Sequence, residues 1–229
     1  MYGRLRPGAM INYLIQSSIA SADKIGLGFS GLKNQSLFWV LSRLSLKINY
    51  PLKWYDKISV ETWPKDVDKI IYLRDFIITD KKQHVAAIAT SGWLAIDSEK
   101  KRPKKIEGVH AGIFDHFKDK HAIRETPVKL GKSTGGEIRE IIPAYSDYDI
   151  NKHVTATRYV DWAMDTLSCE FHETMYPAEI DINFLRETLP GENINLIKTL
   201  LGENTYLFHV TNMVSGLDGV KIRVCFVNI

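Results

Sequence analysis

The segment PGAMINYLIQSSIASADKI, residues 7–25, is the clearest sign of the architecture, because it is the first of two helix-like segments in a repeated pattern. Its apolar residues recur at the spacing of one helix face. They are Ile11, Leu14, Ile15, Ile19, Ala22 and Ile25. Pro7 suits a first helical turn, and Gly26 and Gly28 follow the last one. The sequence therefore predicts an amphipathic helix over residues 7–25.

A second helix-like segment starts near Thr155, and Pro177 lies beyond its end. One face carries Tyr159, Trp162, Ala163, Thr166 and Leu167. Runs with period-2 alternation and many β-branched or aromatic residues follow each helix, which predicts strands. They cover residues 44–50, 57–63, 70–78 and 84–97, then 179–185, 193–201, 205–214 and 220–229, and one more, 137–144, precedes the second helix. We expect an α+β fold in which a helix lies on an antiparallel sheet, twice over.

The repeat divides the chain into an N-terminal unit, residues 1–97, a basic linker, 98–132, and a second unit, 133–229. If Ile11 corresponds to Val160, no residues remain for a strand equivalent to 137–144 in the first unit. Either that unit lacks its opening strand or the sequence starts inside a longer protein. The second interpretation is favoured, because losing the strand would expose a sheet edge.

The composition is that of a soluble globular protein, with 45% apolar and 25% charged residues. Cys169 and Cys225 lie far apart in apolar surroundings, which favours core thiols in a reducing cytosol over a disulfide. No zinc-ligand pattern is present, so we expect no metal and no cofactor. There is no signal segment and no membrane-length apolar run, which indicates a cytoplasmic protein.

Positive charge gathers in the linker, where residues 98–132 hold ten Lys and Arg against five Asp and Glu. The densest part is KKRPKK, residues 100–105. One interpretation is a solvated linker. The other is a docking patch for an acidic partner, such as a carrier protein or the phosphates of coenzyme A. Nucleic acid would need more basic surface with interleaved aromatic residues, so it is not expected.

The stretch SDYDINKHV, residues 146–154, places two carboxylates, an amide and an imidazole just before the second helix. A calcium loop is excluded, because the positions that need Gly and Glu hold Lys152 and Arg158. A turn or helix cap explains Asp149 and Asn151 but does not explain why a histidine stands at position 153. Acid/base hydrolysis explains all three, since a neutral imidazole can take a proton from water and give one to a leaving thiolate. The positive end of the helix could stabilise an oxyanion.

A further carboxylate, Glu187, follows an apolar strand in the segment NFLRETLPG, residues 183–191. On spacing alone, a surface ion pair of Arg186 and Glu187 in a turn is the favoured interpretation. The chain has no Gly-x-Ser-x-Gly segment, so a serine hydrolase of the nucleophile-elbow type is not indicated.

The ordered motifs resemble those of the acyl-acyl-carrier-protein (acyl-ACP) thioesterases of plants and bacteria over nearly the whole chain. D-x-N-x-H-V at 149–154 and Y-x-x-W at 159–162 are similar to that family's signature. The first half adds, in the family's order, Trp39-Val40, Arg43, Trp54-Tyr-Asp56, Thr62-Trp63, Arg74-Asp75-Phe76, Ser91-Gly-Trp93 and Arg102-Pro103. Each motif is weak alone, but the ordered set is specific.

The resemblance implies a double hot-dog fold, two helix-wrapped antiparallel sheets that form a pseudo-dimer within one chain. It implies catalysis by Asp149, Asn151, His153 and Glu187 of the second unit, with the first unit shaping an acyl-chain tunnel. Two positions depart from the family: Thr188 stands where the family has a cysteine once proposed as nucleophile, and Thr155-Ala156 follows His153-Val154 where the plant form has two asparagines. A cysteine-based mechanism is thereby excluded for this chain.

The expected function is hydrolysis of fatty acyl-ACP thioesters to free fatty acid and carrier thiol, which ends fatty acid synthesis. Acyl carrier protein is the expected partner, and the protein is expected to be a monomer (a pseudo-dimer) or a homodimer. The alternatives are an acyl-CoA thioesterase and a catalytically silent acyl-chain-binding protein. Trp39, Trp54, Trp63 and Trp93 are interpreted as core or tunnel-wall residues. His84, His110, His116, His121, His172 and His209 lack a motif and are treated as non-catalytic.

Overall fold

The computed structural model describes residues 3–107, 114, 116–117, 119–133 and 135–229. His110 and parts of the predicted linker lie outside these residues. The chain forms two compact units. The C-terminal unit comprises Met1–Ile11, Tyr50–Trp54 and Val128–Ile229, and the N-terminal unit comprises Asn12–Asn49 and Tyr55–Pro127. The boundary after Pro127 lies inside the predicted 98–132 linker, and the division into 1–97, 98–132 and 133–229 stays a prediction.

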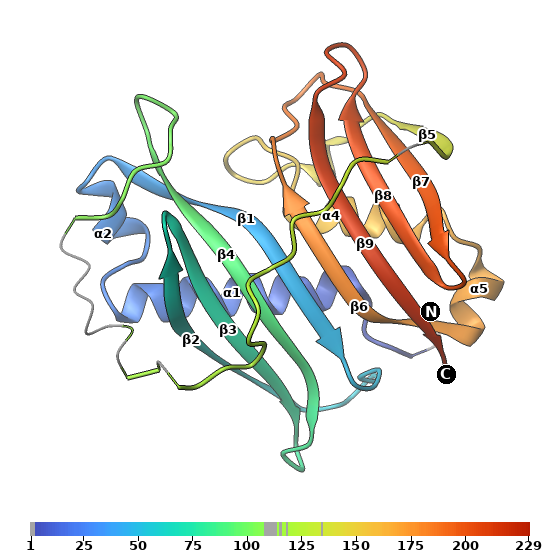
Figure 1. Cartoon of the computed structure of the whole chain (residues 1–229), viewed down its shortest axis with the longest axis horizontal. Helices are drawn as coiled ribbons and strands as arrows, with labels where there is room; N and C mark the ends of the chain where they lie inside the picture. The colour runs from blue at the N-terminus through green and yellow to red at the C-terminus, as the bar shows by residue number, and fades with distance from the viewer. Residues whose placement is uncertain (1–2, 108–113, 115, 118, 134) are drawn as a thin grey trace. The chain divides into compact units, whose positions relative to one another are not determined.

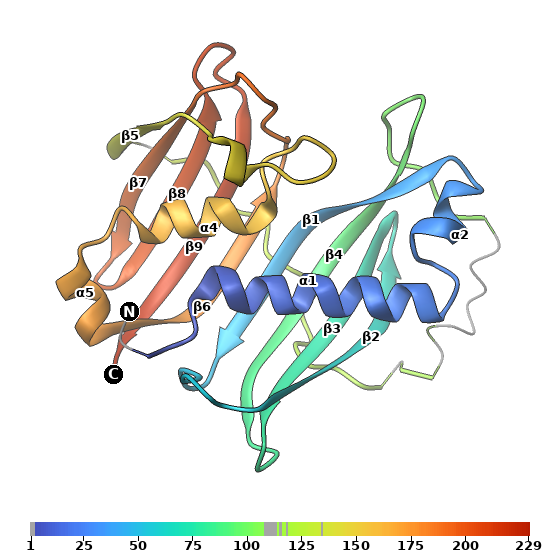
Figure 2. The same ribbon diagram turned by 180° about the vertical axis from the view of Figure 1, so that it is seen from behind.

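The N-terminal unit is an antiparallel sheet of strand order β2-β3-β4-β1 with a helix across one face (Figures 1 and 2). Its elements are most of α1 (Pro7–Lys24), α2 (Phe29–Lys33), β1 (Leu37–Ile48), β2 (Ile58–Asp68), β3 (Ile71–Asp80) and β4 (Val85–Asp97). Helix α1 begins at Pro7, as the sequence predicted. Its residues Ile11 and Leu14 are buried, whereas Ile19 is 48% exposed.

Strand β1 is longer than predicted, beginning at Leu37 instead of Leu44. The register shifts between Leu41 and Arg43, so the alternation of apolar residues is interrupted there. Only the part after this irregularity keeps the period-2 pattern that the prediction used. The short helix α2 was not predicted, because five residues hold too few turns to show a helical period.

The C-terminal unit repeats the arrangement, with strand order β6-β9-β8-β7-β5 and helix α4 across one face (Figure 2). Its elements are β5 (Glu137–Ile141), the 3-10 turn η1 (Tyr145–Asp147), α4 (Ala156–Met164), α5 (Cys169–Thr174), β6 (Met175–Phe184), β7 (Ile194–Gly202), β8 (Thr205–Asn212) and β9 (Asp218–Asn228). Pro177, expected beyond the second helix, lies inside β6. The register of β6 against β9 shifts between Pro177 and Glu179, where a missing N–H is tolerated.

Apolar side chains on the strands of the C-terminal unit form its core. The fully buried ones include Ile180, Ile182, Leu196, Phe208, Val210, Ile222 and Val224. The predicted core position of the thiols is wrong for Cys169, which is exposed at the start of α5, and Cys225 is only half-buried. Neither cysteine is in a disulfide. Within the described residues, no helix has the length and apolar character that crossing a membrane requires.

Candidate active site

A tight loop before α4 carries three of the predicted site residues. Tyr148 and Val154 form an isolated antiparallel bridge that closes the loop. Inside it, the Asp149 N–H donates to the His153 carbonyl at 2.8 Å, and the Lys152 N–H donates to the Asp149 carbonyl at 3.0 Å. Lys152 takes a positive φ of 62° to complete the reversal. The loop therefore brings Asp149 and His153 side by side.

The Asp149 carboxylate holds this loop in shape with one of its two oxygens. Asp149 Oδ1 accepts the backbone N–H groups of Asn151 at 2.8 Å and of His153 at 3.1 Å. The alternative interpretation of Asp149 as a turn residue therefore fits the structure as well. The alternative of a helix cap does not fit, because Thr155 is the residue before α4 and no side chain caps the helix. Asp149 Oδ2 has no hydrogen bond within the part of the chain that the structure describes.

Asp147 holds the loop in place at its N-terminal end. The sequence did not predict it as a site residue. It is 4% exposed. Its Oδ1 accepts Arg158 Nε at 2.6 Å, and its Oδ2 accepts the Ala144 N–H at 2.7 Å. Burial works against the charge of Arg158, but the bond to Asp147 and nearby carboxylates raise the pKa of Arg158 above its ordinary value. The ion pair ties η1 to α4, so the loop between them is held at both ends.

Glu187 lies just after β6, at the same end of the C-terminal unit as the loop. The N–H groups of Leu185 and Arg186 donate to the Gly219 carbonyl at 2.8 and 3.1 Å. The Val154 N–H donates to the Thr188 carbonyl at 3.0 Å. This bond joins the residue after His153 to the residue after Glu187. The structure therefore brings all four predicted site residues to one end of the unit, with His153 half-buried and the other three exposed.

The alternative of a surface ion pair in a turn applies to Arg186 and not to Glu187. Arg186 lies 3.2 Å from Glu192 Oε1, and Glu192 Oε2 also accepts the Leu189 N–H at 2.9 Å. Glu187 makes no hydrogen bond or ion pair with any described residue. The loop thus folds without using the Glu187 carboxylate, which leaves that group available for chemistry.

The motif residues Tyr159 and Trp162 lie on the inner face of α4. Their rings meet edge to face with centroids 5.5 Å apart, and Tyr159 also packs against Phe184 at 6.4 Å. Phe184 is the last residue of β6 before the Glu187 segment. Aromatic packing therefore holds α4 against the end of β6 that leads into the Glu187 segment.

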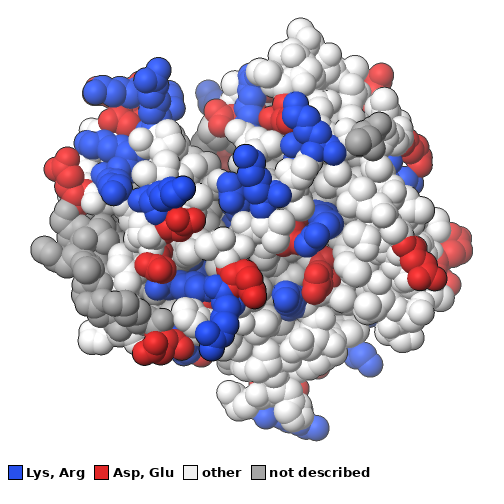
Figure 3. Space-filling model, in the orientation of Figure 1, with Lys and Arg blue, Asp and Glu red and all other residues white. Residues whose placement is uncertain are grey.

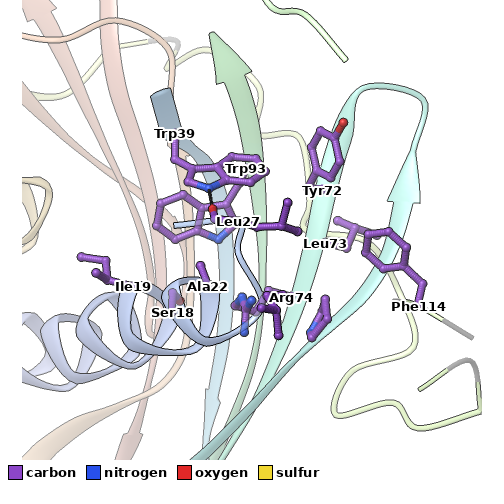
Figure 4. Close-up of a pocket in the computed structure, with 12 residues that line it drawn as sticks. Ser18, Ile19, Ala22, Leu27, Trp39, Tyr72, Leu73, Arg74, Trp93 and Phe114 are labelled. Carbon is purple, nitrogen blue, oxygen red and sulfur yellow. Dashed lines mark hydrogen bonds between the residues drawn. The ribbon is translucent and has the colours of Figure 1, made fainter. Parts of the chain in front are cut away.

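An apolar pocket lies within the N-terminal unit (Figure 4). Ile19 and Ala22 of α1 line one side, and Trp39, Leu73 and Trp93 from the sheet line the other. Its empty space is about 560 Å³, with the open mouth included. The exposed Ile19 is thus explained, since it lines this pocket.

One cation lies at the wall of this apolar pocket. Arg74 is 8% exposed, and its Nη1 donates to Ser21 at 2.9 Å and to Thr62 at 3.2 Å. Burial lowers the pKa of Arg74 to about 10.

The prediction that four tryptophans are core or tunnel-wall residues is confirmed in part. Trp39 and Trp93 are pocket walls, and Trp63 is 2% exposed. It is wrong for Trp54, which is 74% exposed on the segment between β1 and β2. Among the described residues, no group of three or more His, Cys, Asp and Glu side chains could hold a metal ion.

Two tandem units, each a helix on an antiparallel sheet, define a double hot-dog protein, as the family resemblance implied. Within that class the family is shown by two family models. The Acyl-ACP thioesterase N-terminal domain matches residues 1–111, and the Acyl-ACP thioesterase C-terminal domain matches residues 131–227. The chain belongs to the acyl-ACP thioesterase family.

Relatives with established names support this assignment. The chain is 26% identical to an acyl-[acyl-carrier-protein] hydrolase of Cuphea viscosissima over 93% of its own length and 55% of the relative. It is 26% identical to the dodecanoyl-[acyl-carrier-protein] hydrolase of Cinnamomum camphora, over 92% of the chain and 59% of the relative. The chain thus spans little more than half the length of these curated relatives.

Solved structures agree over almost the whole chain. An acyl-ACP thioesterase from Bacteroides thetaiotaomicron is 26% identical with a TM-score of 0.90, covering 98% of this chain and 91% of that one. The 12:0-ACP thioesterase of Umbellularia californica, at 20% identity and a TM-score of 0.85, covers 99% of this chain and 92% of its own. The second likeness supports the fold alone.

Proposed function

We propose that the protein hydrolyses fatty acyl thioesters of acyl carrier protein, releasing free fatty acid and the carrier thiol. The observation that carries the proposal is the hydrogen bond between Val154 and Thr188, which joins the His153 loop to the Glu187 segment. It assembles an imidazole and an unengaged carboxylate at one end of the unit. Membership of the acyl-ACP thioesterase family supplies the substrate class.

In the proposed reaction, water attacks the thioester carbonyl carbon and the carrier thiolate leaves. His153 takes a proton from the water and gives one to the departing sulfur, while Glu187 positions the water or accepts its proton. Asn151 orients the carbonyl or the imidazole without changing charge. The residue after Glu187 is Thr188, which is not a nucleophilic thiol, so water is the proposed nucleophile.

The two oxygens of Asp149 suggest a divided role. Oδ1 is engaged by two backbone N–H groups. We propose that Oδ2 acts on His153 or on the water as orienter or base, with direct nucleophilic attack by Asp149 the less favoured option. The start of α4, which no side chain caps, presents N–H groups that suit the oxyanion formed on the carbonyl.

The apolar pocket of the N-terminal unit is the proposed site for the acyl chain. Its lining is almost entirely hydrocarbon, with aromatic rings from Trp39 and Trp93. Burial of methylene groups in such a pocket contributes about 0.8 kcal/mol each. Chain-length preference would follow from how many methylenes the pocket accepts.

The carrier is proposed to dock on the basic segment of the N-terminal unit. Lys100, Lys101, Arg102, Lys104 and Lys105 are all exposed. Figure 3 shows Lys and Arg gathered at the upper left, over the turn that follows β4. A positive patch speeds encounter with an acidic carrier protein. Coenzyme A presents the same phosphopantetheine arm, so the active site alone does not exclude it.

The function is tested by measuring thiol release from acyl-ACP and acyl-CoA of matched chain lengths, at low and moderate salt. The proposal expects faster release from acyl-ACP, with an advantage that shrinks as salt screens the charges. Equal or faster release from acyl-CoA would replace the proposed carrier. Tight fatty-acid retention without thiol release from either carrier would indicate a silent binding protein. A cytoplasmic location and a monomeric or homodimeric state stay predictions, open to cell fractionation and light scattering.

A further inference from the structure

Tyr159 carries a buried hydroxyl that the proposed chemistry does not use. The residue is 2% exposed, and its Oη has no hydrogen-bond partner among the described residues. A buried polar group without a partner costs free energy, whereas phenylalanine would fill the same space without that cost. The hydroxyl therefore needs an explanation other than packing.

The hydroxyl faces the segment that carries Glu187. Burial raises the pKa of Tyr159 to about 12, and the charges of Glu187 and Glu192 add to this rise, whereas the hydroxyl and backbone N–H of Thr188 work against it. Tyr159 is therefore protonated at neutral pH. Both Glu187 and Thr188 lie close enough to affect its hydroxyl electrostatically. Thr188 is close, but no atom of it reaches hydrogen-bond geometry with Oη.

Thr188 is the junction between the two halves of the site. It is 3% exposed, and its carbonyl accepts the Val154 N–H at 3.0 Å. One side of Thr188 is thus tied to the residue after His153, and the other faces Tyr159 on α4. A bond between Tyr159 and Thr188 would fix the backbone of Glu187 from a second direction.

We propose that Tyr159 is a positioning residue of the active site, whose hydroxyl closes a hydrogen bond with Thr188 during turnover and so fixes the Glu187 carboxylate relative to His153. The role rests on the proposed function. Hydrogen bonds in active sites are often open without substrate and tighten when substrate binds. Thr188, in the position of the family's cysteine, serves in this proposal as a hydroxyl partner.

The test compares Tyr159→Phe, Thr188→Val, the double variant and Thr188→Ser in the full chain. Tyr159→Phe is expected to lower kcat about tenfold with KM within about twofold, because only the arrangement at the reacting carbon changes. Its Tm should be unchanged or higher, since no hydrogen bond is lost in the resting protein. Thr188→Ser should keep activity, and the double variant should be no slower than either single variant, because both remove one bond.

Tyr176→Phe is the matched control, since Tyr176 is another buried tyrosine of the same unit. Its hydroxyl donates to the Leu5 carbonyl at 3.0 Å, so this variant should lose Tm and keep kcat. A Tyr159→Phe protein with unchanged kcat overturns the proposal. So does a loss of Tm like that of Tyr176→Phe, or losses of kcat that multiply in the double variant. A wild-type chain that releases no thiol from acyl-ACP refutes the proposed function, and this role with it. An active wild type whose kcat is unchanged by Tyr159→Phe refutes this role alone.

Discussion

At the scale of single residues, Asp149 shows how one side chain can shape a site and take part in it. Its Oδ1 accepts two backbone N–H groups, from Asn151 and His153, and its Oδ2 is unengaged by any described residue. An asparagine at this position keeps an oxygen acceptor for the loop but loses the charge. Substitution can therefore separate the two contributions.

We expect Asp149→Asn to keep a thermal stability close to that of the wild type while thiol release falls at least about a hundredfold. Asp149→Ala should lose activity and also melt lower, because two N–H groups lose their acceptor. Thermal melts and initial rates on acyl-ACP check both. Near-normal turnover by Asp149→Asn would mean that Asp149 is only a turn residue.

His209 gives a pH-dependent stability outside the site. It is 5% exposed on β8, with Nε2 3.0 Å from Asp218 Oδ1. Burial lowers the pKa of His209 below its ordinary value, and Lys221 and Lys132 act in the same direction, although Asp218 opposes them. The unfolded chain therefore binds a proton more readily at this residue. Its contribution is complete above the ordinary histidine pKa and is lost as the pH falls toward the folded value.

We expect the free energy of unfolding, measured with urea, to fall between pH 8 and pH 5.5. His209→Gln should flatten the part of this slope that belongs to His209, because glutamine does not titrate. A wild-type slope that survives His209→Gln would contradict the assignment.

The sequence singled out Asp149, Asn151, His153 and Glu187 because their chemistry is visible in a short motif. It did not predict a site role for Asp147, or for Tyr159 of the Y-x-x-W motif. Asp147 matters through Arg158, eleven positions on along the chain, and Tyr159 through Thr188, a residue of the β6–β7 connection. Such partners are set by tertiary structure, which residue spacing does not show.

At the scale of elements, the limits of residue spacing also explain why some predicted ends of strands differ from the observed ones. The period of the pattern predicted α1 and most strands, but the irregularities at Leu41 and Pro177 shifted the predicted starts of β1 and β6. The sequence predicted an apolar face of α1 lying on the sheet, and Ile19 and Ala22 of that face line a pocket. Periodicity identifies an apolar face without saying whether protein or a ligand covers it.

Filling the pocket should change chain-length preference. Ala22→Phe places a ring in the proposed acyl site, so thiol release from the longest accepted chain should fall at least about tenfold while shorter chains are spared. Ala20→Phe, at an exposed position of the same helix that is not part of the pocket lining, is the matched control. A length profile that both variants leave unchanged would place the acyl chain elsewhere.

At the scale of the whole molecule, a net charge of +3 conceals a concentrated basic segment. Reversing Lys100 and Lys101 to glutamate should raise KM for acyl-ACP by about three- to tenfold at low salt and little at high salt. Reversing Lys81 and Lys82, an exposed pair on the β3–β4 turn, makes the same change in net charge and serves as control. Equal effects of the two pairs would indicate a general charge effect instead of a docking site.

The most direct test of the proposed hydrolysis is thiol release from acyl-ACP by the wild type, His153→Ala and Glu187→Gln at equal concentration. We expect release by the wild type, a loss of about 10²- to 10⁴-fold for His153→Ala, and a loss of at least about tenfold for Glu187→Gln, with all three folded by circular dichroism. Near-normal release by His153→Ala would contradict the assignment of the site. No release by the folded wild type on any chain length would contradict the function.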